Sequence, residues 1–171
     1  MDTLVKNAED HLLTGYDVLR IADNKTKIML YEDLKNYNNI DDVLKPFNSV
    51  ILAYESLDRQ GGHWVLLMKN MVGNQYVVEF FDSYGFYPDD EEKLKIYNTQ
   101  PYLTNLLKTC PYEFVYNDHR LQKKLEDVNT CGRHVACRLR FRDYSLNEYI
   151  SMMTKNKYDA DYMVTILTLL V

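Results

Sequence analysis

The sequence predicts an α+β fold, in which blocks of helices at both ends of the chain enclose a group of strands. Apolar residues recur at helical spacing near the N-terminus and again beyond residue 131, whereas strand-forming runs gather between residues 49 and 81. The chain has 171 residues, of which 46% are hydrophobic. A chain of this length and composition is expected to form a single domain, with a core that needs no disulfide or metal.

The N-terminal part is predicted to be mainly helical. Apolar positions between residues 7 and 22 recur at helical spacing, and Thr14 and Gly15 are expected to divide this helix into two pieces. Residues 30–44 are predicted to be a second helical or mixed stretch, in which Asp41 caps a short final helix.

Three strands are predicted next, because the runs at residues 49–54, 63–69 and 75–81 are rich in Val, Ile, Phe and Tyr. Gly61-Gly62 and Gly73-Asn74 separate these runs as turns. The three strands are therefore expected to form an antiparallel meander at the centre of a mixed sheet.

The rest of the chain adds one strand and several helices. Residues 112–116 are predicted to be a strand, and 89–107 a charged loop followed by a helix that Pro101 interrupts. Residues 131–141 are predicted to be a central helix that begins at a cysteine, because an apolar stripe has helical spacing there. The stripe consists of Cys131, Val135 and Leu139. Two closing helices are expected at 145–153 and 159–170, capped by Ser145 and Asp159.

Charge and composition exclude several classes of function. The chain has 20 Lys and Arg against 25 Asp and Glu, a net charge of −5, which disfavours a dedicated nucleic-acid or anionic-membrane binder. Three cysteines are too few for a disulfide framework, and the first ten residues lack the pattern of a signal peptide. We therefore expect a protein that is not secreted or membrane-bound and lives in a reducing compartment. No residue cluster indicates a metal or an organic cofactor.

Four residues have the chemistry of a thiol-dependent catalytic site. A nucleophilic cysteine needs an imidazole nearby and benefits from the positive end of a helix, and a third group must orient the imidazole. Cys131 opens a predicted helix, His63 begins one strand, and Asp82 ends the neighbouring strand. Gln122 precedes Cys131 in the chain, where its amide can help to bind an oxyanion together with the Cys131 backbone N–H.

The motifs around these residues resemble a known family. The segments GHWVLL (62–67), FFDSYG (80–85), LQ (121–122) and TCG (130–132), in this order, are similar to the adenain and SUMO-protease superfamily of cysteine peptidases. The similarity extends over residues 49–142. The N-terminal segments LTGYD and YEDL resemble the compact maturation proteases of virophages and large DNA viruses.

The resemblance implies a papain-like core and a catalytic triad in the chain order His, Asp, Cys. It implies that Cys131 is the nucleophile, His63 the general base and acid, and Asp82 the orienting carboxylate. Gln122 would complete the oxyanion hole, with Asn129 and Asn117 as alternatives because the segment from Gln122 to Cys131 is longer than usual. Substrate-binding residues would be Trp64, as the wall of a narrow groove, and Gly132, which leaves room for close approach of a substrate.

The function implied by the resemblance is cleavage of viral capsid or other structural precursors during virion maturation, after small residues such as Gly-Gly or Gly-X-Gly. The alternatives are an isopeptidase that removes a ubiquitin-like modifier and a catalytically inactive peptide-binding relative. The implied partner is a protein or peptide substrate of a monomeric enzyme in the virion and host cytoplasm. The requirement for an activating peptide or DNA is left open.

Several neighbouring residues have simpler interpretations. Residues 117–142 carry seven basic and three acidic residues, which predicts either a positive field around Cys131, a solvated helix face or a small docking patch for DNA or an acidic substrate. Cys137 is expected to be a packing residue of the same helix, and Cys110 a semi-buried thiol in a loop or at a strand edge. His134 lies in a Cys-x-x-His pattern but is predicted to be a structural or surface histidine, since a zinc site needs about four ligands. Ser83 is expected to hydrogen-bond its own turn.

Overall fold

A computed structural model describes residues 2–55 and 62–171. Its centre is a five-stranded sheet in the order β1-β2-β3-β4-β5. The strands are β1 (Ile28–Leu30), β2 (Ser49–Tyr54), β3 (His63–Val72), β4 (Gln75–Phe81) and β5 (Glu113–Tyr116). β2, β3 and β4 are antiparallel, as predicted, whereas the two edge strands β1 and β5 run parallel to their neighbours.

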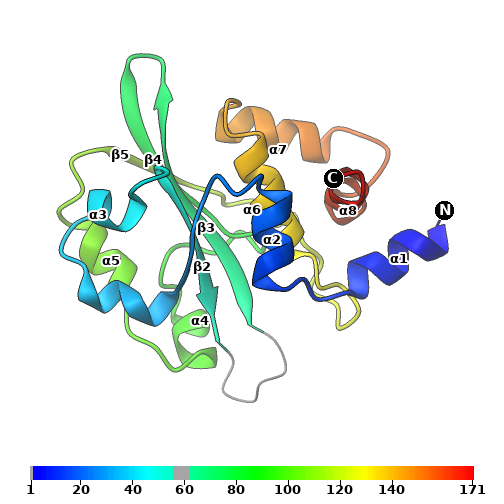
Figure 1. Ribbon diagram of the computed structural model, residues 1–171, viewed down its shortest axis with the longest axis horizontal. Coiled ribbons are helices and arrows are strands. Elements are labelled where there is room, and N and C mark those ends of the chain that lie inside the picture. Colours follow the sequence, from blue (N-terminus) through cyan, green and yellow to red (C-terminus); the bar gives the residue numbers. More distant parts are fainter. Residues whose placement is uncertain (1, 56–61) are drawn as a thin grey trace.

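Helices cover the sheet from both sides (Figure 1). One group contains the 3₁₀-helix η1 (Tyr31–Asn36), α3 (Ile40–Leu44), α4 (Glu91–Ile96) and α5 (Tyr102–Leu107). The other group contains α1 (Asp2–Asp10), α2 (Gly15–Ile21), α6 (Cys131–Arg140), α7 (Leu146–Thr154) and α8 (Ala160–Leu169). This architecture confirms the predicted α+β class and the helix that begins at the cysteine.

The sheet is buried on both faces, which explains why its strands are almost continuous apolar runs. Ile51, Leu66 and Phe81 point into a core shared with α2, α6, α7 and α8. Leu52 and Leu67, on the opposite face, point into a second core that is closed by η1, α3 and α5. Central strands held in this way form a rigid support for groups at their ends.

The helix boundaries follow side-chain caps. Thr14 caps α2 in a reciprocal capping box with Asp17, so the predicted break before Gly15 is a helix start. Ser145 and Asp159 cap α7 and α8, as predicted. The prediction that Asp41 caps α3 is wrong, because the Asn39 side chain accepts the Asp42 N–H and starts the helix earlier.

β1 was not predicted, since its three residues lie at the edge of a stretch that has mixed periodicity. Pro101 separates α4 from α5, which agrees with the predicted interruption. Within the described residues, no helix combines the length and the apolar character that crossing a bilayer requires.

Gly62 determines how the chain enters β3. A Cβ atom at this position would lie 2.1 Å from the Tyr54 carbonyl oxygen, so only glycine permits this close approach to the end of β2. His63 follows immediately and pairs with Tyr54 across the two strands. The other half of the predicted Gly61-Gly62 turn, Gly61, lies outside the described residues.

Candidate active site

The sheet brings His63 and Asp82 together. His63 is the first residue of β3, and Asp82 directly follows the last residue of β4. Because Leu66 pairs with Phe81 in the antiparallel register, these two side chains lie at the same end of adjacent strands. His63 Nε2 is 2.9 Å from Asp82 Oδ1, and both side chains are buried. The carboxylate fixes the orientation of the ring and leaves Nδ1 available for a second partner.

Cys131, at the start of α6, is the candidate for that second partner. The residue is buried, and its thiol is one of the groups that raise the pKa of His63, so it lies near the imidazole. Val135 and Leu139, one and two turns further along, anchor the helix in the core beneath the sheet. Residues 63, 82 and 131, which are widely separated in the sequence, thus meet at one point.

The electrostatics of this cluster favour a protonated imidazole. Burial lowers the pKa of His63, but the charge of Asp82 and the hydrogen bonds to Asp82 and Cys131 outweigh it and raise the pKa to about 9. Burial alone would raise the pKa of Asp82, yet His63 and Lys93 hold the pKa of this carboxyl well below its usual range. An imidazolium ion beside a cysteine is the arrangement that activates a thiolate.

Lys93 is a functional candidate that the sequence analysis missed. Its Nζ lies 2.7 Å from Asp82 Oδ2, and only 3% of the residue is exposed. The rings of Tyr54, Phe80 and Phe86 surround the ammonium group at 5.0–5.7 Å. The acidic run before Lys93 suggests a solvated helix start, and nothing in the local pattern indicates that this lysine turns inward onto Asp82.

Replacing Lys93 with methionine is expected to move the alkaline limb of the pH–rate profile to higher pH. The thioether can fill the space between the aromatic rings, but the variant loses a positive charge close to the His63–Asp82 pair. The imidazolium then loses a repulsive neighbour, so the pKa of His63 rises further above 9. Measuring kcat/KM against pH on a peptide substrate tests this.

Lys95→Met is the matched control, because Lys95 lies on the same helix but is exposed. It should leave the pH–rate profile unchanged.

Thermal denaturation across the same pH range gives a second readout. The raised pKa of His63 contributes stability that is fully present below about pH 6.5 and is lost as the pH rises through 9. A Lys93→Met profile that stays in place or moves to lower pH would contradict the assignment.

The three amides considered for the oxyanion hole differ in whether their N–H groups already have acceptors. Asn117 donates both amide hydrogens, to the carbonyls of Asp82 and His119 at 2.8 and 2.9 Å. The Asn129 amide is directed to the backbone and side chain of Asp10. Gln122 donates to one carbonyl, that of Val128 at 3.1 Å, so its second amide hydrogen has no acceptor among the described residues.

Ser83 orients the Gln122 amide. The Ser83 hydroxyl donates to Gln122 Oε1 at 2.7 Å, and the Ser83 carbonyl accepts the backbone N–H groups of Leu121 and Gln122 at 2.9 Å. The prediction that Ser83 bonds its own turn is wrong. Asp82 Oδ1 already accepts the Tyr84 N–H of that turn, which leaves the Ser83 hydroxyl free for the distant loop.

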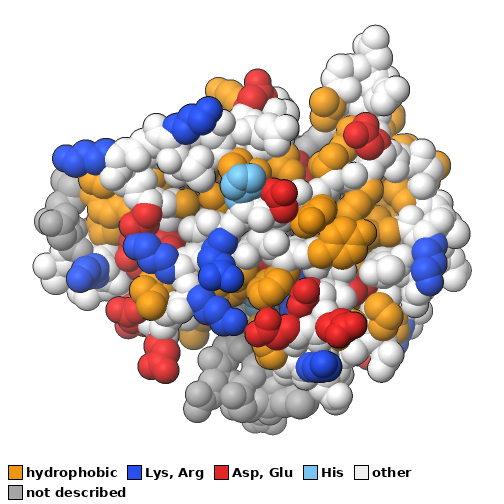
Figure 2. Space-filling model, turned by 180° about the vertical axis from the view of Figure 1, so that it is seen from behind, with side chains coloured by type: hydrophobic (Ala, Val, Ile, Leu, Met, Phe, Trp, Pro, Cys, Tyr) orange, Lys and Arg blue, Asp and Glu red, His pale blue; other side chains and the backbone are white. Residues whose placement is uncertain are grey.

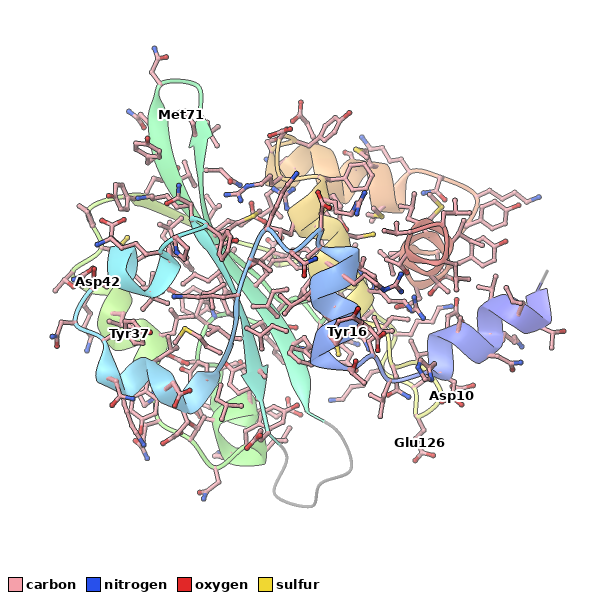
Figure 3. The ribbon with its side chains drawn as sticks, in the orientation of Figure 1. Asp10, Tyr16, Tyr37, Asp42, Met71 and Glu126 are labelled. Carbon is pink, nitrogen blue, oxygen red and sulfur yellow. The ribbon has the colours of Figure 1, made fainter. Side chains whose placement is uncertain are left out.

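The loop before Cys131 and the first turn of α6 are both hydrogen-bonded to α1. The Asn129 N–H donates to the Glu9 carbonyl at 2.7 Å, and Arg133 donates to the Ala8 carbonyl at 3.2 Å. Figure 3 shows Asp10, at the end of α1, close to the loop that carries Glu126. Asn129 therefore has a structural role in joining α1 to this loop.

Trp64 lies beside the site between two glycines. A Cβ atom at Gly132 would meet Trp64 Cδ1 at 3.5 Å and a Val18 methyl at 3.0 Å, and one at Gly15 would meet Trp64 Cη2 at 3.8 Å. Gly132 thus makes room for α2 and for the indole ring. A cavity of about 910 Å³ opens beside Trp64 and His63, lined also by Leu13, Ile28, Tyr54 and Tyr97.

The sequence is similar to a protein of a virophage. It is 36% identical over 176 residues to the uncharacterized protein V9 of the Sputnik virophage, and the match covers 96% of this chain and 98% of V9. The chain belongs to the V9 family. No family model matches the sequence.

The V9-family chain has the fold of a viral protease. Two crystal structures of the ASFV pS273R protease, one with selenomethionine, superpose with TM-scores of 0.55 and 0.54. They are 20% and 18% identical in sequence, and each match covers 95% of this chain and 68% of the protease. The peptidase fold that was expected from the resemblance is therefore confirmed.

Two of the arginines of α6 are structural in this V9-family protein. Arg138 is buried and makes two bonds to Glu79, at 2.8 and 2.9 Å, while Arg133 is buried against Thr168. For these two residues, the predictions of a solvated face and of a docking patch are wrong. Lys and Arg side chains on the face seen in Figure 2 lie scattered among acidic and apolar ones.

The other cysteines are placed as predicted, and His134 takes the structural one of its two predicted roles. Cys137 is fully buried, and burial raises the pKa of its thiol to about 12. Cys110 is half-buried beside Tyr112. His134 is buried and bonds Asp161, and the described residues contain no group of three or more His, Cys, Asp or Glu arranged to hold a metal ion.

Proposed function

We propose that this protein is a cysteine endopeptidase that processes viral structural precursors during particle maturation. The observation that carries the proposal is the buried His63 ring, bonded to the Asp82 carboxylate and with its pKa raised further by the nearby Cys131 at the start of α6. The fold of a viral protease and the relationship to a virophage protein support both the chemistry and the setting.

In the proposed reaction, the Cys131 thiolate attacks the scissile carbonyl carbon and forms a tetrahedral oxyanion. The Cys131 N–H and the free amide hydrogen of Gln122 bind that oxyanion. The C–N bond then breaks, and the His63 imidazolium gives its proton to the leaving amine. Neutral His63 next takes a proton from water, whose hydroxide attacks the thioester and releases the thiolate.

Trp64 and the cavity beside it form the proposed substrate site. The indole packs against Gly132, the residue after Cys131, and lines the cavity together with His63, so we propose that it narrows the approach to the thiol. A narrow approach favours substrates with small residues next to the cleaved bond, such as Gly-Gly or Gly-X-Gly. We propose further that the whole chain is one peptidase domain, which acts as a monomer in the virion and host cytoplasm.

The test is incubation of the purified protein with viral capsid precursors and with quenched peptides that contain Gly-Gly or an Ala-Ala control. We expect discrete cuts after the small residues, with the Ala-Ala peptides cleaved more slowly. A fluorogenic ubiquitin-like modifier is included, because much faster cleavage of this substrate would favour the isopeptidase alternative. A folded protein that leaves every substrate intact would favour an inactive peptide-binding relative.

A further inference from the structure

A second buried carboxylate, Asp161, lies near the proposed site without contacting His63. It occupies the first turn of α8 and is fully buried. Its Oδ2 accepts the backbone N–H of Lys123 at 2.9 Å. Its Oδ1 accepts the Thr130 hydroxyl at 2.5 Å and His134 Nε2 at 3.0 Å. Three donors satisfy this carboxylate, as a buried charge requires.

Two of these donors belong to residues that adjoin Gln122 and Cys131, the residues of the proposed oxyanion site, in the sequence. Lys123 follows Gln122, and Thr130 precedes Cys131. One carboxylate therefore joins the two ends of the loop that separates the amide from the nucleophile. Because Asp161 belongs to α8, which packs against α6, the loop is closed against a helix of the core.

The bond between Thr130 and Asp161 also changes the start of α6. A threonine at the N-cap usually accepts an N–H from the first turn of its own helix. The Thr130 hydroxyl makes no such bond, since it donates to Asp161 instead. Within the described part of the chain, no side chain caps the first N–H groups of α6, which include that of Cys131. An uncapped helix start presents N–H donors to an anion.

We infer that Asp161 is the positioning residue of the oxyanion site. By holding Lys123 and Thr130 on one carboxylate, it fixes the distance between the Gln122 amide and the Cys131 N–H. By engaging the Thr130 hydroxyl, it keeps the donors at the start of α6 free for the reaction. This inference rests on the proposed peptidase function, and it assigns Asp161 no contact with the substrate.

The experiment compares two probes of the Cys131 thiol in wild type and in the Asp161→Asn variant. A Gly-Gly aldehyde adds to the thiol and forms a tetrahedral hemithioacetal, whose oxygen needs the oxyanion site. Iodoacetamide alkylates the thiolate with loss of iodide and needs no such site. We expect the aldehyde inhibition constant to rise and kcat to fall by about 10- to 100-fold in the variant. The rate of alkylation at Cys131 should change by less than about threefold.

Asp159→Asn is the matched control. Asp159 lies on the same turn and binds the Lys123 side chain at 2.7 Å, but it contacts neither Thr130 nor the Lys123 backbone. Asparagine caps helices as well as aspartate does, so this variant should behave as wild type with both probes. Thr130→Val gives a second test if Asp161→Asn folds poorly, and Thr130→Ser should restore the wild-type behaviour.

Two outcomes would overturn the inference. Either aldehyde affinity and kcat remain at wild-type values in folded Asp161→Asn and Thr130→Val, or aldehyde binding and alkylation fall by the same factor. The second result would place the damage at the Cys131–His63 pair. If the protein is not a peptidase, the result differs from both of these outcomes. The wild-type protein itself would then show neither selective alkylation of Cys131 nor peptide cleavage.

Discussion

Replacing Cys131 with alanine should abolish peptide cleavage, with kcat falling by about 10⁴-fold or more, while the fold is retained. The reason is that, in the proposed mechanism, the thiol forms the covalent intermediate, whereas its removal takes away little packing. His63→Ala should produce a loss of similar size, because the residues act as a unit. The measurement is peptide hydrolysis, with the fluorescence of the single tryptophan, Trp64, as a check of folding.

Mass spectrometry after treatment with a Gly-Gly vinyl sulfone locates the reactive thiol. We expect one adduct on the wild-type protein, at Cys131, and none on the Cys131→Ala or His63→Ala variants. Cys137→Ala is the control, because burial holds the pKa of Cys137 near 12 and keeps that thiol unreactive. Equal modification of Cys110, Cys131 and Cys137 would contradict the activation of one thiol by an imidazole.

The largest effect on stability is expected at Arg138. This side chain is 1% exposed, pairs with Glu79 through two hydrogen bonds, and also binds the Phe141 and Tyr144 carbonyls. Arg138→Met would leave the Glu79 carboxylate buried and unpaired, which costs about 3–5 kcal/mol. For a chain of this size, each kcal/mol lowers Tm by about 2–4 °C. Chemical and thermal denaturation measure this loss.

Two further variants separate the ion pair from simple packing. Arg140→Met removes an exposed arginine that bonds only the Ile21 carbonyl, and it should cost less than about 1 kcal/mol. The double variant Arg138→Met with Glu79→Gln should recover part of the lost stability, since it no longer buries an unpaired charge. Equal stability of Arg138→Met and Arg140→Met would show that the pair is not a determinant of the fold.

The fold was largely predictable because its signals are local. The apolar stripe from Cys131 to Leu139 determines where α6 begins and which side it buries, and the side chains of Ser145 and Asp159 define two further helix starts. The meander follows from three apolar runs, the last two of which are joined by the turn at Gly73-Asn74. His63 and Asp82 could be paired because antiparallel strands of known length place their ends side by side.

Lys93 and Asp161 were not predictable, because their roles depend on contacts that local sequence does not encode. Lys93 follows four acidic residues, and only the rings of Tyr54, Phe80 and Phe86, from three separate segments, create its buried pocket. Asp161 has the features of an ordinary first-turn acidic residue of α8. Its partners lie more than twenty residues away, at Lys123, Thr130 and His134.

In the proposed mechanism, the consecutive placement of Asp82 and Ser83 makes two parts of the site depend on the end of one strand. Asp82 orients the imidazole that moves the proton, and Ser83 orients the amide that faces the charge on oxygen. A displacement of the end of β4 would misplace both the imidazole and the amide. The two resulting losses in rate would multiply. Under the proposed function, a ligand that moves this strand end would therefore lower the reaction rate more steeply than one that disturbs either contact alone.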